Sequence, residues 1–397
     1  MPPSRPETDS LEGRIRRIEA SLGILFAHLG LVIPEDPGQA KSDAIAAPKE
    51  HVTLEDEPAT TPRLHTHRPV DSSRNEIRLL ALKPSKNEGD PLEGNLLHVS
   101  LNDRPTGHLR MPGTTPESKA LVGYSALSYT WGRTNPDSTI TLDGQYFHIT
   151  ESLDHALRKL RMGTPSPNME ITRYMRLHTP SQVTYWWIDA ICISQTDIEE
   201  RNSQVALMRQ IYSSAAGVCV WLGDEADGSE EAILLVEKIL SPPRRGPGQP
   251  ESAFPSLTDE GKLRNLWSLS SLFHRPWWDR VWVRQEVSLH RNVVVLCGNA
   301  CSSFVSFEFA AKAVQYAVGL IGPDMQMDHS PGSYFNHGLE GADKVAGLNN
   351  VRVAASYGDV YADLCQLLFS ARGCLATDPR DKVFGVLGRS GDLRPRR

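Results

Sequence analysis

The 397-residue sequence lacks any uninterrupted apolar stretch of the roughly 20 residues that a membrane-spanning helix needs. It has no block of basic residues, and its formal net charge of −6 argues against a protein held mainly by nucleic-acid phosphates. Six cysteines are too few for a disulfide framework in a chain of this length. We therefore expect no membrane span, no nucleic-acid partner and a reducing, cytoplasmic compartment.

Generic catalytic and metal-binding motifs are also missing. The sequence contains no Gly-x-x-x-x-Gly-Lys phosphate loop, no Gly-x-Gly-x-x-Gly turn, no Gly-x-Ser-x-Gly elbow and no His-Glu-x-x-His pair. Cys297 and Cys301 are close in sequence, but no second Cys/His pair stands nearby to complete a zinc site. We expect neither a metal nor a resident cofactor.

The N-terminal part of the chain carries a short heptad pattern followed by a polar segment. Apolar residues alternate spacings of four and three, which predicts a helix within residues 1–33; they are Leu11, Ile15, Ile18, Leu22, Leu25 and Leu29. This helix either associates with a second copy, giving a homo-oligomer, or docks on its own protein. Residues 34–75 are polar and rich in proline, so we predict a disordered linker there.

From residue 76 onward, strand and helix patterns alternate. Expected strands or apolar runs are 77–82, 96–101, 121–131, 139–142, 145–149, 184–193, 217–222 and 293–297. Expected helices are 151–162, 199–214, 230–240, 263–273, 304–320 and 360–372. Strand, helix, strand, helix is typical of a parallel sheet with covering helices. We therefore predict an α/β domain over 76–300 and a mainly helical C-terminal extension over 301–397.

Three blocks in this region resemble a known family. Residues 124–132 (YSALSYTWG), 187–223 (beginning WIDAICIS) and 275–286 (RPWWDRVWVRQE) are similar, in order, to the three blocks of the heterokaryon incompatibility (HET) domain of filamentous fungi. Residues 377–388 resemble a segment that often follows this domain. One departure is Ser194, where the family usually has Asn. The resemblance implies fungal non-self recognition, with other incompatibility proteins as partners and cell death as the outcome.

The HET domain is regarded as a distant relative of the TIR domain, which implies a TIR-like, flavodoxin-like fold. Residues 124–129 are similar to the opening strand of TIR domains. Trp282 and Glu286 are the closest match to the Trp and Glu of a later TIR segment, whose Glu is catalytic in NAD-cleaving members. The resemblance therefore implies NAD as a substrate and Glu286 as the catalytic residue.

Cleavage of the nicotinamide–ribose bond passes through an oxocarbenium-like state, which a nearby carboxylate stabilises. On this hypothesis Trp131 or Trp282 offers a stacking face for the substrate. Asp189, Arg284 or Arg201 holds ribose or phosphate groups.

Each of these residues also has a structural interpretation. Glu286 can pair with Arg280 or Arg284 on a helix face, and the tryptophans can be core residues. Asp189 lies within an apolar run and needs a partner, either Arg201 or the backbone at the strand end. The sequence also fits three hypotheses for the function of the whole protein. It could be an NAD-cleaving effector, a non-enzymatic module that acts by oligomerisation, or a degenerate copy with neither activity.

Overall fold

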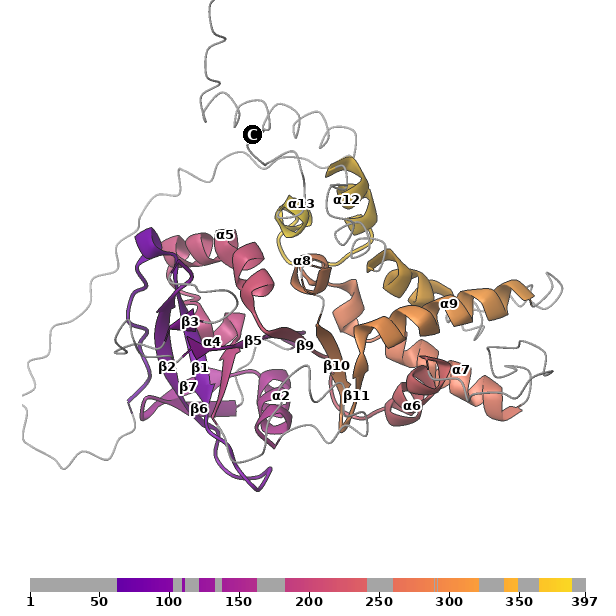
Figure 1. Cartoon of the computed structure of the whole chain (residues 1–397), viewed down its shortest axis with the longest axis horizontal. Helices are drawn as coiled ribbons and strands as arrows, with labels where there is room; N and C mark the ends of the chain where they lie inside the picture. Colours follow the sequence, from indigo (N-terminus) through magenta and orange to yellow (C-terminus); the bar gives the residue numbers. More distant parts are fainter. Residues whose placement is uncertain are drawn as a thin grey trace, which may run out of the picture. The chain divides into compact units, whose positions relative to one another are not determined.

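The fold is built on a mixed sheet, seen in a computed structural model (Figure 1). The structure describes residues 63–102, 109–110, 121–132, 138–162, 183–240, 260–288, 290, 292–320, 339–348 and 364–387. All of them belong to one compact unit that begins at Thr61. The predicted heptad helix lies outside the described residues, as does the linker up to residue 62.

Nine strands form the main sheet, in the order β11-β10-β9-β5-β8-β1-β2-β6-β7. Their bounds are β1 Glu76–Leu82, β2 Glu93–Ser100, β5 Ser125–Tyr129, β6 Ser138–Leu142, β7 Gln145–Ile149, β8 Thr184–Trp187, β9 Gly217–Trp221, β10 Val293–Cys297 and β11 Ala300–Ser303. A separate antiparallel pair joins β3 (Leu109–Arg110) to β4 (Leu121–Val122).

The centre of the sheet is parallel and its flanks are largely antiparallel. Strands β8, β5, β9 and β10 run parallel to one another. Strand β11 is antiparallel to β10, and β1 is antiparallel to both β8 and β2. The α/β class is therefore confirmed, but the prediction of a mainly parallel sheet is wrong. Alternation of apolar side chains identifies strands, but it does not fix the direction in which each strand joins its neighbour.

Helices cover both faces of this sheet. The helices are α2 Glu151–Met162, α4 Asp189–Cys192, α5 Ile198–Ser214, α6 Ser229–Leu240, α7 Glu260–Phe273, α8 Val283–Ser288, α9 Phe304–Leu320, a helix over 339–348, α12 Leu364–Ala371 and α13 Asp381–Leu387. Short 3-10 helices are η1 Ser72–Arg74 and η2 Pro276–Asp279. Along β9, Val218 and Val220 join the core under α5, α6 and α9, whereas Cys219 and Trp221 join the core under α2.

Several elements agree closely with the sequence patterns. The strands predicted at 139–142 and 145–149 form the hairpin of β6 and β7, and its turn residues Asp143 and Gly144 both have positive φ, at 51° and 79°. Helices α2 and α9 have the predicted bounds. The apolar run 184–193 is different, because the strand ends at Trp187 and α4 begins at Asp189.

Residues 63–75 fall within the predicted linker, and here the chain runs against the folded unit. Leu64 bridges to Tyr146 at the edge of the sheet, and the His67 ring contacts the backbone oxygen of Ile191 at 2.8 Å. The backbone oxygen of Arg68 accepts hydrogen bonds from the buried Arg78 side chain. Contacts of this kind hold a segment whose composition alone favours disorder.

Candidate functional site

The candidate site lies where the parallel strands end. Ser128 and Tyr129 are the last residues of β5, and Asp189 follows shortly after the end of β8. The chain runs from β5 to β8 on one side and then crosses to β9 on the other, so a topological switch point lies beside β5. In open α/β sheets, ligands bind outside the carboxyl ends of the strands at such a point.

Glu286, on α8, reaches this end of β5. Its carboxylate accepts a hydrogen bond from the Ser128 hydroxyl, which is 158 residues away in sequence. The Ser128 oxygen in turn accepts a hydrogen bond of 2.8 Å from the indole N–H of Trp277. Because Trp277 is fully buried, this relay from indole to hydroxyl to carboxylate fixes one oxygen of Glu286.

Asp189 is held from two sides. One carboxylate oxygen accepts a hydrogen bond of 3.0 Å from the indole N–H of Trp131, and the other accepts one of 2.8 Å from the backbone N–H of Ala190. Asp189 itself is half-buried, and Trp131 is 36% exposed. Trp131 and Asp189 therefore form a partly open layer near the buried Glu286.

Arg280 is the cation of this cluster. Its guanidinium lies 3.5 Å from a Glu286 oxygen, and its charge also acts on Asp189. Burial raises the pKa of Glu286 above its ordinary value, despite the opposing effects of Arg280 and Ser128, and the charge of Asp189 raises it further. Burial likewise raises the pKa of Asp189, against Arg280 and the Trp131 hydrogen bond. A buried and a half-buried acid that share one guanidinium are typical of functional sites, and structural networks show the same feature.

Two tyrosines adjoin these acids. Burial raises the pKa of both Tyr129 and Tyr212, and the charges of Asp189 and Glu286 add to the effect. The Tyr212 hydroxyl donates to the backbone oxygen of Leu127 at 3.3 Å, whereas the buried Tyr129 hydroxyl has no hydrogen-bond partner among the residues that the structure describes. A buried donor beside two carboxylates is free to bind a polar group of a ligand.

The structure brings together three of the six residues that the sequence singles out, namely Trp131, Asp189 and Glu286. Arg284 instead points to Cys374, with its Nε 3.2 Å from that sulfur. Trp282 is half-buried and bonds with the side chain of Asp381, and Arg201 is exposed on α5. These last three residues face the C-terminal segment or solvent.

Sequence reasoning did not identify Ser128, Tyr129, Trp277 or Arg280 as site residues. Ser128 and Tyr129 lie in the first HET-like block, and Trp277 and Arg280 lie in the third. The signal that could have found them is position: a polar residue that ends an apolar parallel strand faces the ligand-binding edge of the sheet.

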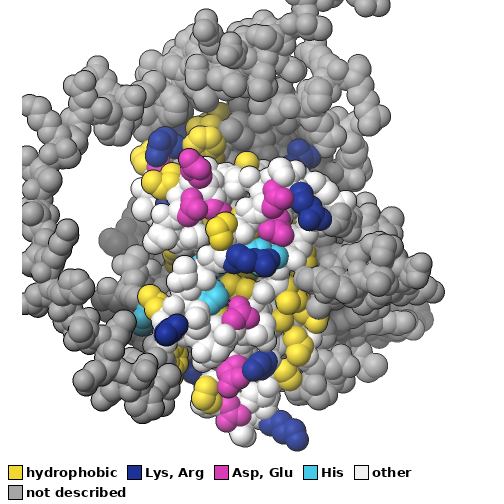
Figure 2. Space-filling model, turned by 90° about the vertical axis from the view of Figure 1, so that its left-hand side faces the viewer, with side chains coloured by type: hydrophobic (Ala, Val, Ile, Leu, Met, Phe, Trp, Pro, Cys, Tyr) yellow, Lys and Arg dark blue, Asp and Glu magenta, His cyan; other side chains and the backbone are white. Residues whose placement is uncertain are grey.

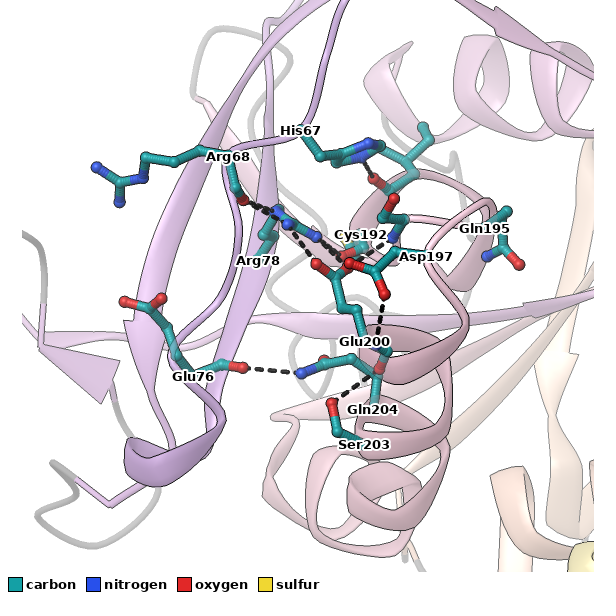
Figure 3. A network of polar contacts seen from close by, with 12 residues as sticks. His67, Arg68, Glu76, Arg78, Cys192, Gln195, Asp197, Glu200, Ser203 and Gln204 are labelled. Carbon is teal, nitrogen blue, oxygen red and sulfur yellow. Dashed lines mark hydrogen bonds and ion pairs between the residues drawn. The ribbon is translucent and has the colours of Figure 1, made fainter.

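A second buried carboxylate, Glu200 on α5, has a different setting (Figure 3). Arg78 on β1 is fully buried and grips both Glu200 oxygens, at 2.6 and 2.8 Å. The backbone N–H of Ser194 donates to Glu200 at 2.7 Å, and Arg78 also donates to the Cys192 backbone oxygen at 3.0 Å. Although burial raises the pKa of Glu200, these hydrogen bonds outweigh it and lower the pKa overall. This pair holds both ends of the segment that follows Asp189.

The remaining surface carries no obvious second centre. Within the described ranges, no group of three or more His, Cys, Asp or Glu side chains is placed to hold a metal ion. Of the helices described, none combines the length and apolar character that crossing a bilayer demands. On the face seen in Figure 2, acidic and basic side chains of the coloured residues are interspersed instead of gathered by sign.

Comparison with known proteins finds one similar family and one similar protein. Residues 124–286, which run from the residue before β5 to Glu286, match the profile of the family described as "Heterokaryon incompatibility protein (HET)". The chain is also similar to "Heterokaryon incompatibility protein 6, OR allele" of Neurospora crassa, with 28% identity over 379 residues covering 75% of this chain. It spans about half the length of that relative, at 50%. No solved structure matches the chain. Residues 124–286 are therefore similar to the HET domain family, and the chain as a whole is similar to a fungal heterokaryon incompatibility protein.

Proposed function

We propose that this protein acts in fungal non-self recognition and that its HET domain triggers cell death in the cytoplasm. The support is the family match over residues 124–286 and the similarity to a relative named for heterokaryon incompatibility. We propose that the partner that activates this chain is a further incompatibility protein or a second copy of the chain.

We further propose that the domain is TIR-like and cleaves NAD at the carboxyl ends of its parallel strands. The order β8-β5-β9-β10 agrees with a flavodoxin-like arrangement, in which the first strand lies between the second and third. The observation that carries the enzymatic proposal is the convergence of Glu286, Asp189 and Trp131 from three separate segments of the chain. A structural ion pair alone does not require an exposed indole beside two acids.

The reaction would proceed by cleavage of the bond between nicotinamide nitrogen and ribose carbon C1′. The bonding electron pair goes to the nicotinamide nitrogen and removes its positive charge. A water oxygen then bonds to C1′ and releases one proton, so NAD and water give ADP-ribose, nicotinamide and a proton. Glu286 in its ionised form stabilises the positive charge on the ribose and takes the proton from water. Trp131 offers its exposed ring to the nicotinamide.

Asp189 and Arg280 complete this assignment. The Asp189 carboxylate accepts hydrogen bonds from ribose hydroxyls, and the Arg280 guanidinium opposes the rise in the pKa of Glu286 that burial causes. Because the pKa of Glu286 is raised, we expect turnover to decrease as the pH falls, and to do so at a higher pH than an ordinary glutamate would give.

One feature favours the alternative of a non-enzymatic assembly module. The Glu286 side chain is only 3% exposed, and Ser128 and Arg280 already contact its carboxylate. A substrate can reach this carboxylate only if a side chain in contact with it, such as that of Arg280, moves. Under the alternative, the same acids serve to fix α8 against β5, and the domain signals by oligomerisation.

NAD turnover by the purified protein separates the two proposals. We expect Glu286→Gln to lower NAD turnover at least about 100-fold, as is usual for loss of a general acid–base group. Glu93→Gln is the matched control, because it makes the same chemical change at a half-exposed glutamate. Glu93 lies on β2 and pairs with Lys83. The assay should be run with and without enforced oligomerisation. Equal turnover by wild type and Glu286→Gln would exclude Glu286 as the catalytic residue, and no turnover by wild type in either state would favour the assembly module.

A further inference from the structure

Segment 279–284, which carries Arg280 and leads to Glu286, is clamped by the C-terminal part of the chain. The backbone N–H of Leu375 donates to the Asp279 oxygen at 2.6 Å, and the N–H of Val281 donates to the Leu375 oxygen at 3.1 Å. These two bonds form a parallel bridge between Arg280 and Leu375. Leu375, which belongs to residues 364–387, thus holds the backbone immediately before and immediately after Arg280.

Side chains strengthen the same contact. Val281 is fully buried in a small hydrophobic cluster that is separate from the two larger cores. The other buried members of this cluster come from residues 364–387 and are Leu367, Ala371, Cys374 and Val386. A Cβ on Gly385 of α13 would lie 3.3 Å from a Val281 methyl carbon, so the helix packs closely here. The Arg284–Cys374 and Trp282–Asp381 contacts lie on either side of this cluster.

The consequence of this clamp is electrostatic. Arg280 is the guanidinium whose charge opposes the raised pKa of both Asp189 and Glu286. Its side chain is one-fifth exposed and has a 3.5 Å contact to Glu286, which is longer than a strong ion pair. The position of Arg280 therefore depends more on its backbone than on the grip of its own head group.

We propose that residues 364–387 are a positioning element of the candidate site, and that Leu375 sets the place of Arg280 between Asp189 and Glu286. The family profile ends at residue 286, so this segment lies outside the matched domain. The consequence for turnover rests on the proposed NAD cleavage, whereas the consequences for backbone protection and for the titration of Glu286 do not.

Leu375→Pro tests the proposal, with Leu375→Ala as its matched control. Proline removes the N–H that donates to Asp279, whereas alanine keeps both backbone bonds and loses only a side chain that is 68% exposed. In hydrogen exchange, we expect residues 279–288 to exchange about fivefold faster in Leu375→Pro, the factor that corresponds to one net backbone hydrogen bond. We expect wild-type exchange in Leu375→Ala.

The second measurement is the pH dependence of unfolding, with each variant compared with its Glu286→Gln double mutant. If Arg280 leaves its place, the pKa of Glu286 rises further, so the Glu286-dependent part of the curve moves to higher pH in Leu375→Pro and in Arg280→Gln. Arg280→Gln changes no residue of the C-terminal segment, so it controls for a general loss of folding in Leu375→Pro. If Leu375 acts through Arg280, adding Leu375→Pro to Arg280→Gln should not move the Glu286-dependent part of the curve any further.

Activity supplies a third readout if wild type cleaves NAD. The acidic limb of the kcat/KM profile should move to higher pH in Leu375→Pro and stay in place in Leu375→Ala. Unchanged exchange over 279–288, or a Glu286 titration in Leu375→Pro equal to that in Leu375→Ala, would overturn the proposal. Failure of wild type to cleave NAD would overturn the proposed function and leave the exchange and titration results to decide this one.

Discussion

Two buried glutamates in this domain lie beside arginines, and their settings are opposite. Glu200 is gripped at both oxygens by Arg78, at 2.6 and 2.8 Å, and its pKa is lowered. Glu286 has one long contact of 3.5 Å to Arg280, and burial leaves its pKa raised. The first carboxylate is fully compensated by the protein, and the second is not.

The difference separates a structural pair from a candidate functional one. Arg78 and Glu200 satisfy each other and the backbone of Ser194 and Cys192, so this pair gains from being closed to solvent and ligand. Glu286 and Asp189 share one guanidinium, so ionising both carboxyls in the folded protein costs free energy that Arg280 only partly offsets. Such a cost in stability is typical of sites kept for function.

Identical substitutions should therefore have unequal effects on stability. We expect Glu200→Gln to lower the free energy of unfolding by about 3 kcal/mol at pH 7, because it leaves the buried Arg78 charge without its partner. We expect Glu286→Gln to change it by less than about 1 kcal/mol or to raise it, because the amide avoids the cost of a buried charge. Urea denaturation of both variants and wild type measures the two values.

Ser288→Ala serves as the control for α8, because Ser288 is buried on that helix and its hydroxyl donates only to the helix backbone at Arg284. A loss of similar size in Glu200→Gln and Glu286→Gln would show that both pairs are structural and would remove the contrast.

This contrast shows what sequence patterns could and could not predict. Periodicity predicted most elements, including α2, α9 and the β6–β7 hairpin, because local apolar spacing determines them. The resemblance pointed to Glu286, Asp189 and Trp131, which the fold brings together. Pairing partners were predicted only in part: a backbone N–H does bond Asp189, and Arg280 does pair with Glu286. The contacts of Trp131 and Arg280 with Asp189 were not predicted.

The reason is that partners are set by non-local packing. The Ser128–Glu286 and Arg78–Glu200 contacts join residues 158 and 122 positions apart. The break of the run 184–193 into β8 and α4 has the same origin, since Arg78 on β1 holds the Cys192 backbone oxygen. Tertiary contacts of this kind override the strand propensity of an apolar run.

The two glutamates should also give pH dependences of opposite sign. The folded pKa of Glu200 is lowered, so its contribution to stability is present above the ordinary glutamate pKa and is lost as pH falls through the folded value. The folded pKa of Glu286 is raised, so stability from its protonated form is present below the ordinary pKa and is lost as pH rises through the folded value.

Unfolding free energies measured from acid to neutral pH test this prediction. We define each difference as the unfolding free energy of wild type minus that of the variant. On acidification, this value should fall for Glu200→Gln and rise for Glu286→Gln. Two differences that change in the same direction would contradict the assigned shift of one glutamate.

The smallest expected effect extends the comparison to a pair of tyrosines. The Tyr124 hydroxyl donates to the Ile211 backbone oxygen at 2.5 Å, whereas the buried Tyr129 hydroxyl, beside the two acids, has no partner in the described part of the chain. We expect Tyr124→Phe to cost about 1 kcal/mol and Tyr129→Phe to cost nothing measurable by denaturation, because only the first loses a hydrogen bond. If the Tyr129 hydroxyl is kept for a ligand, Tyr129→Phe instead weakens NAD binding several-fold while Tyr124→Phe leaves it unchanged. If Tyr129→Phe instead loses as much stability as Tyr124→Phe, the Tyr129 hydroxyl has a structural role, as the Glu200 carboxylate does.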